Sequence, residues 1–178
     1  IEIWRHGPAP ERPCDEGVAL DLAIHDLDLL RHVFDDEPVL VEARPNGQAS
    51  IVERLDAQTE LQSGGRASLS VGWDTAARER RIVVVGESGT IEADLVQQEL
   101  RYCLSGDPEW RSQSCPGEPL VHEHDAFFEA VRNGGPAPVS SLDGFHALFL
   151  VHALLDSAAT GRPVPVLPSE LDMDMTWR

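Results

Sequence analysis

The stretch from Gly17 to Phe34 places the strongest constraint on how this chain can fold. It contains no proline, its only glycine is its first residue, and most of its side chains are apolar. A helix that is apolar almost all round is buried, whereas a surface helix shows a broad polar face. The stretch therefore predicts one buried helix over residues 17–34.

Four titratable side chains interrupt this apolar surface in a single narrow stripe. At 3.6 residues per turn, their spacing brings them to the same side of a helix. The stripe consists of Asp21, His25, Asp28 and His32. Ionisable groups on a buried helix are costly unless they pair with one another or face a wet cavity. A cavity lined by carboxylate and imidazole suits proton transfer, which makes Asp21 and His25 candidate catalytic residues.

A structural interpretation of the same stripe is also open. Asp21 and His25 can form a structural pair, while Asp28 and His32 are solvated near the end of the helix. Asp26 lies off the stripe and interrupts the apolar arc. A carboxylate in that position needs a partner, which the sequence does not identify.

Length and charge limit the class of protein. With 178 residues the chain is long enough for one domain with a core and too short for two ordinary ones, so we expect a single domain over 1–178. Asp and Glu number 31 against 14 basic residues, all of them Arg, which gives a net charge of −17. This balance argues against nucleic acid and anionic membranes as partners, since both bind basic patches.

The chain also lacks the segments that direct proteins to or across membranes. No apolar run is as long as a membrane span, and no signal segment opens the sequence. The three cysteines show no C-x-x-C spacing, which indicates free thiols in a reducing compartment, so we expect a cytoplasmic protein. Because the first residue is Ile, we expect the chain to be processed, cut or partial.

After the first helix, the sequence predicts strands and then helices. Short alternating or β-branched runs separated by turn residues indicate a mostly antiparallel meander. The predicted meander consists of strands 38–44, 51–62, 66–73, 80–85, 90–94 and 97–103, while residues 1–5 are a strand or the end of one and 164–167 could be a short edge strand. Residues 107–119 read as a loop, and helices are expected over 120–133 and 142–160. This order fits an α+β fold in which helices cover one face of an open sheet of about six strands.

Two further expectations concern the helix over 120–133 and the exposed face of the sheet. Phe127, Phe128 and Val131 should point inward from the helix over 120–133. The strands at 66–73 and 81–85 carry more apolar surface than one layer of helices needs, which predicts a homo-oligomer formed through the exposed sheet face. His122-x-His124 has no matching carboxylate or cysteine cluster, so no metal site is expected.

Residues 17–28, which read G-V-A-L-D-L-A-I-H-D-L-D, resemble the signature helix of the Gfo/Idh/MocA family of glucose–fructose oxidoreductases and inositol dehydrogenases. Four other segments are similar to the same family, in the same order. They are residues 5–8, 86–91, 127–139 and 157–163. The resemblance is to the family's C-terminal domain, which has an α+β fold like that of dihydrodipicolinate reductase and follows an N-terminal Rossmann domain.

The resemblance implies that this chain is the substrate-binding and acid/base half of an NAD(P)-dependent oxidoreductase acting on a sugar, a cyclitol or a related hydroxyl compound. It implies that His25 is the general acid/base on the reacting hydroxyl and that Asp21 orients it or binds substrate. Arg5 and Asp28 are expected to contact the substrate. NAD or NADP is expected to bind mainly to a Rossmann domain, in cis or in trans, because the chain has no G-x-G-x-x-G turn. The isolated chain is expected to be inactive.

Two other kinds of function stay open at this level. A stand-alone enzyme could use Asp21 and His25 for cofactor-free isomerisation or dehydration. A non-catalytic chain could serve only as an oligomerisation module. A G-x-G-x-x-G coding stretch upstream of Ile1 would favour the dehydrogenase over both.

Overall fold

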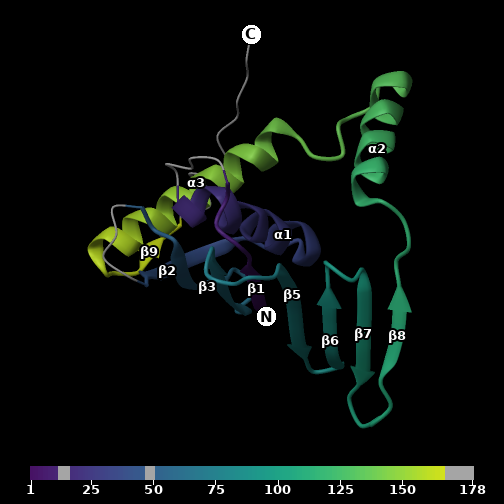
Figure 1. The fold of residues 1–178 in the computed structure, drawn as a ribbon, viewed down its shortest axis with the longest axis horizontal. Coiled ribbons are helices and arrows are strands. Elements are labelled where there is room, and N and C mark those ends of the chain that lie inside the picture. The colour runs from purple at the N-terminus through teal and green to yellow at the C-terminus, as the bar shows by residue number, and fades with distance from the viewer. Residues whose placement is uncertain (12–16, 47–50, 167–178) are drawn as a thin grey trace.

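The computed structural model describes residues 1–11, 17–46 and 51–166. Within these residues the strands form one sheet of nine, in the order β8-β7-β6-β5-β1-β4-β3-β2-β9 (Figure 1). The strands are β1 Glu2–His6, β2 Pro38–Pro45, β3 Arg54–Leu61, β4 Arg66–Gly72, β5 Glu79–Gly86, β6 Gly89–Asp94, β7 Glu99–Leu104, β8 Arg111–Ser114 and β9 Val164–Pro165. The helices are the π-helical turn η1 Ala19–Ala23 and the α-helices α1 Ile24–Phe34, α2 Pro119–Asn133 and α3 Ser141–Thr160.

The α+β class and the mostly antiparallel pairing are confirmed, but the sheet has nine strands rather than about six. The N-terminal β1 enters its centre, parallel to β4 and antiparallel to β5. The short β9 joins the edge beside β2. Strand β8 lies in the segment that the sequence predicts as a loop, because its pairing with β7 comes from the backbone rather than from an alternating apolar pattern.

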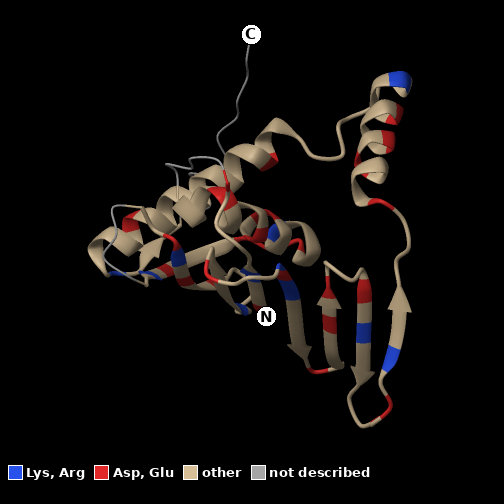
Figure 2. Cartoon of the chain, in the orientation of Figure 1, with Lys and Arg blue, Asp and Glu red and all other residues tan. Residues whose placement is uncertain are grey.

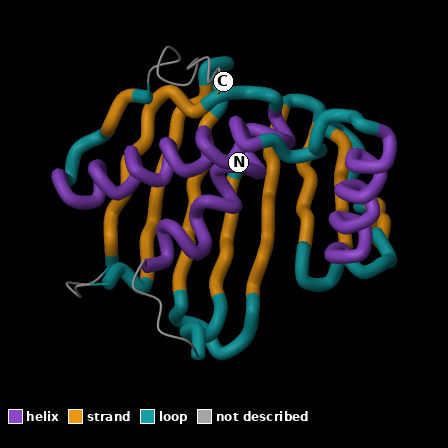
Figure 3. Tube along the Cα trace, turned by 90° about the horizontal axis from the view of Figure 1, so that it is seen from above, coloured by secondary structure: helices purple, strands orange, loops and turns teal. Residues whose placement is uncertain are grey.

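Helices α1 and α3 pack together and cover one face of half the sheet (Figure 3). Alternate side chains of β4 face them, and Leu69 and Val71 are buried there with Leu27, Leu150 and Leu154. Ser140 and Asp143 form a capping box at the start of α3, because the side chain of each accepts a hydrogen bond from the other's backbone N–H. None of the helices in the described residues is long and apolar enough to cross a membrane.

The other half of the sheet, β5 to β8, contains no fully buried residue. Helix α2 stands near this end of the sheet and makes no substantial contact with another described element (Figures 1 and 3). The prediction that Phe127, Phe128 and Val131 point into a core is therefore wrong, since these side chains are 54%, 56% and 66% exposed. Their apolar stripe is present, but nothing in the described chain covers it.

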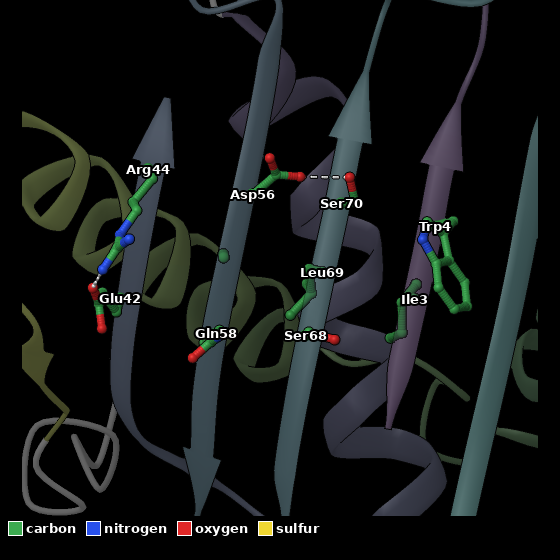
Figure 4. A pocket seen from close by; sticks show the side chains of 10 residues that line it. Ile3, Trp4, Glu42, Arg44, Asp56, Gln58, Ser68, Leu69 and Ser70 are labelled. Carbon is green, nitrogen blue, oxygen red and sulfur yellow. Dashed lines mark hydrogen bonds and ion pairs between the residues drawn. The ribbon is translucent and has the colours of Figure 1, made fainter. Parts of the chain in front are cut away.

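The sheet face opposite α1 and α3 is polar over β1 to β4. Ser68 and Ser70 point to it from β4, and Asp56 and Gln58 point to it from β3, around a hollow that also includes Trp4 (Figure 4). The apolar residues that suggested an oligomer contact in β4 instead face the helices. Any contact through this part of the sheet therefore rests on hydrogen bonds and on Trp4, not on the apolar side chains of β4.

Candidate active site

The first helix is not one regular α-helix as predicted. Its first turn, η1, is π-helical, and α1 continues from Ile24. Gly17 starts this region with a positive φ, and a Cβ there would lie 3.1 Å from the carbonyl oxygen of Val52. Single-turn π-helical segments are frequent at functional sites, because they change which side of a helix each residue faces.

The change in winding divides the predicted titratable stripe between two pockets. Asp21 lines one pocket together with Arg5. His25, Asp28 and His32 line another, whose far wall includes Asp143 of α3. The prediction of one stripe assumed 3.6 residues per turn throughout, and the wider π turn breaks that assumption between Asp21 and His25.

Asp21 is positioned by the indole of Trp73, which lies just after β4. Trp73 Nε1 donates a hydrogen bond of 3.1 Å to Asp21 Oδ2. Strand β4 therefore fixes the carboxylate from outside the helix. His25, four residues later, is exposed on the surface of α1 and open to a ligand.

The missing partner of Asp26 is Arg5. Arg5 Nε donates to Asp26 Oδ1 over 2.7 Å, and Nη2 lies 2.7 Å from the same oxygen. Asp26 is fully buried, and its Oδ2 has no hydrogen-bond partner among the described residues. Burial raises the pKa of Asp26, while the hydrogen bond and the charge of Arg5 lower it. Arg5 thus has a structural role as well as a place in the wall of the pocket with Asp21.

Two arginines that sequence reasoning missed lie in the same pocket of about 440 Å³ as Arg5 and Asp21. Arg80 sits directly opposite Arg5 in the β1–β5 pairing, and Arg78 lies just before β5. Burial lowers the pKa of Arg80, and the charges of Arg5 and Arg78 lower it further. Arg78 and Arg80 are two residues apart, so alternation along an extended segment puts both side chains on the same side. Arg5 lies beside them only because β1 pairs with β5 in the middle of the sheet.

The pocket that contains His25 is closed on one side by ion pairs between α1 and its surroundings. Arg31 binds Glu37 through two hydrogen bonds of 2.7 Å each, which raise the pKa of Arg31. Arg31 also contacts His146 of α3. His146 is therefore a buried histidine with a structural partner, in line with its position on an apolar helix.

A separate polar cluster lies at the edge of the open sheet face. His6 Nδ1 is 2.7 Å from Asp74 Oδ1, and His6 Nε2 is 3.1 Å from Ser70 Oγ. Gly72 permits this approach, because a Cβ there would lie 2.7 Å from Asp74 Oδ1 and 2.9 Å from His6 Nδ1. The hydrogen bond with His6 and that with Arg54 lower the pKa of Asp74. Ser70 also donates to Asp56 over 2.6 Å, which fixes the hydroxyl rather than activating it.

The described residues do not form the usual site for a nicotinamide dinucleotide. Its pyrophosphate binds a glycine-rich turn at a helix N-terminus. The nearest spacing, Gly86 to Gly89, pairs across the β5–β6 hairpin, with no helix after it. Among residues 1–11, 17–46 and 51–166 no group of three or more His, Cys, Asp or Glu side chains could hold a metal ion. Cys14 lies outside the described residues.

The fold and the helix that carries Asp21 and His25 match a known class of protein. The model for the oxidoreductase family, C-terminal alpha/beta domain, matches residues 4–166. The chain therefore belongs to the Gfo/Idh/MocA oxidoreductase family, as a C-terminal domain.

Curated proteins to which the chain is similar include inositol dehydrogenases. The chain is 28% identical over 182 residues to inositol 2-dehydrogenase 3 of Saccharopolyspora erythraea, covering 92% of this chain and 51% of that protein. It is 28% identical over 194 residues to myo-inositol 2-dehydrogenase of Thermotoga maritima, covering 92% and 54%. The chain thus spans about half the length of these curated relatives.

Solved structures share the fold. Levoglucosan dehydrogenase, solved in complex with NADH, superposes with a TM-score of 0.82 at 17% identity, over 93% of this chain and 57% of that one. At this identity the likeness concerns the arrangement of the elements.

Proposed function

We propose that this chain is the substrate-binding and acid/base half of an NAD(P)-dependent oxidoreductase that acts on a sugar, a cyclitol or a related hydroxyl compound. The observation that carries the proposal is the pair of pockets on one helix. Asp21 is held by Trp73 in the first, and His25 is exposed in the second. Family membership and the inositol dehydrogenase relatives support the same assignment.

In this proposal, His25 takes the proton from the reacting hydroxyl and returns it in the reverse direction. An exposed imidazole suits this role because its ring nitrogens can both accept and donate a proton. The substrate extends along the helix and contacts both pockets: Asp21 binds a neighbouring hydroxyl beside Arg5, and Asp28 borders the part of the substrate that faces His25. NAD or NADP supplies hydride transfer when bound, and we assign its binding to a Rossmann domain in cis or in trans.

The proposal is tested by two substitutions in the enzyme assembled with its dinucleotide-binding domain. His25→Ala should lower kcat by about 10²–10⁴-fold, the usual cost of losing a general acid/base. Asp21→Asn should also abolish most turnover while preserving the fold, because the amide oxygen still accepts the hydrogen bond from Trp73. Steady-state kinetics with myo-inositol and a panel of sugars measures both.

His152→Ala is the matched control, since His152 is exposed on α3 and lines neither of these two pockets. Its kcat should equal that of the unmodified enzyme. Unchanged kcat in a folded His25→Ala protein would contradict the assignment of the general acid/base.

A further inference from the structure

The pocket beside Asp21 is lined by three arginines, an unusual feature in a chain of net charge −17. Arg5 comes from the centre of the sheet, Arg80 from the next strand, and Arg78 from the segment that leads into that strand. The stem of Arg78 packs near Gly7, where a Cβ would lie 3.6 Å from its Cγ. Backbone elements therefore bring all three side chains to one cavity.

The charges of these arginines are only partly matched. Arg5 is paired with the buried Asp26. Arg78 and Arg80 form no ion pair with any carboxylate among the described residues, although the chain has 31 acidic side chains. The acids that line the pocket are Asp21, bound by Trp73, and Glu11 at its mouth.

Holding like charges together has a cost. Arg5 and Arg80 are directly opposite each other in adjacent strands, an arrangement that destabilises a sheet when the charges match. Burial is the main cause of the lowered pKa of Arg80; the charges of Arg5 and Arg78 lower this pKa further, and those of Asp26 and Asp21 oppose the shift. A bound anion would relieve this repulsion.

Two kinds of recognition therefore meet in one cavity. The guanidinium groups offer planar forks of N–H donors that match the oxygens of a carboxylate or a phosphate. Asp21 accepts hydrogen bonds from hydroxyl groups, and the indole of Trp73 offers an apolar surface beside it.

We infer that this pocket binds the oxyanion of an acidic polyol, a sugar carboxylate or sugar phosphate, with Arg78 and Arg80 on the anion and Asp21 on the hydroxyl groups. The inference deepens the proposed function and rests on it for the role of the polyol as substrate. It specifies a charged substrate, which distinguishes this chain from an enzyme for a neutral cyclitol.

The inference is tested by binding to the full chain, followed by calorimetry. The ligands are glucuronate, glucose 6-phosphate and neutral glucose. One or both acidic sugars should bind more tightly than glucose, by about tenfold or more, because hydrogen bonds to charged groups are stronger than those between neutral groups. Their affinity should fall as salt is raised. Preference for one acid over the other identifies the carboxylate or the phosphate as the source.

Arg78→Met and Arg80→Met should each remove most of this preference and leave the weak binding of glucose unchanged. Arg132→Met is the matched control, since it removes the same charge from exposed α2. Thermal unfolding checks that each variant is folded. Equal affinity for charged and neutral sugars in the unmodified chain, or an equal effect of Arg132→Met, would overturn the inference.

NADH is the remaining ligand in the series, because its pyrophosphate carries the same oxyanions. We expect it to bind this chain weakly or not at all. Micromolar binding of NADH that is lost in Arg80→Met would assign the arginines to the dinucleotide and overturn the substrate assignment. None of these binding measurements requires turnover. A failure of this inference is therefore distinguishable from a failure of the His25 assignment, which is measured by kcat.

Discussion

At the scale of single residues, the Arg5–Asp26 pair joins the stability of the fold to the site. It connects the central strand β1 to α1, and it lies beneath the pocket that contains Asp21. One carboxylate oxygen accepts both contacts from Arg5, and the other has no partner among the described residues. Such a pair stabilises only while both members are present.

Arg5→Met should lower the free energy of unfolding by about 3–5 kcal/mol at neutral pH, because it leaves a buried carboxylate without a counter-charge. Replacing both residues, as Arg5→Met with Asp26→Leu, should recover most of the loss. The exposed Arg44, paired with Glu42, supplies the control, and Arg44→Met should cost only about 0–1 kcal/mol. Urea unfolding measures all three.

The pH dependence of the Arg5→Met variant follows from the same pair. The folded pKa of Asp26 is already raised, and removing Arg5 takes away the interactions that hold it down. A raised folded pKa means that folding favours the protonated acid, so stability is lost as pH rises toward that pKa. The loss caused by Arg5→Met should therefore be smaller at about pH 5 than at about pH 7. An equal loss at both would contradict an unpaired Asp26 carboxylate as its cause.

At the scale of elements, α2 is the helix that the described chain leaves without a packing partner. One side carries Leu120, Val121, Phe127, Phe128 and Val131, all more than half exposed. Its other residues include acids, visible along the helix in Figure 2. The repulsion of a −17 chain disfavours a second copy against this helix. The chain spans about half the length of its curated relatives, and the occupant that we propose for this stripe is the dinucleotide-binding domain of the proposed function.

Phe128→Asp should weaken assembly with the dinucleotide-binding domain, because it puts a charge into the apolar stripe of α2. The melting temperature of the isolated chain should not change, since Phe128 is exposed and α2 makes no substantial contact with another described element. Glu129→Gln, on an exposed neighbouring position of the same helix, should alter neither. Hydrogen exchange of α2 with and without the domain measures the contact. Unchanged protection of α2 on assembly would refute the assignment.

At the scale of the whole molecule, we expect the chain to form a homo-oligomer through the open sheet face. The hollow around Trp4, Ser68 and Ser70 supplies hydrogen-bonding groups for a second copy, and persistence against a −17 charge requires a large contact (Figure 4). Ser68→Glu should shift the oligomer toward monomer, whereas Ser114→Glu at the distant edge strand should not. Light scattering that finds a monomer at high concentration and moderate salt would contradict this expectation.

Much of the fold follows from local patterns in the sequence. Alternation predicted most strands, and the predicted helices over 120–133 and 142–160 agree closely with α2 and α3, which end at Gly134 and Gly161. The apolar arc of residues 17–34 predicted a helix packed into the core. These features depend on neighbours within a few positions along the chain, so the sequence alone determined them.

Only the tertiary structure decided the contents of each pocket. Placing β1 between β4 and β5 brings Arg5 to Asp26 and Arg80, across 21 residues or more of chain. The π turn changes the helix winding between Asp21 and His25, and the described part of the chain leaves the apolar stripe of α2 uncovered. Local pattern cannot specify such pairings, because strand order and helix winding are set by which distant surfaces pack together once the chain is folded.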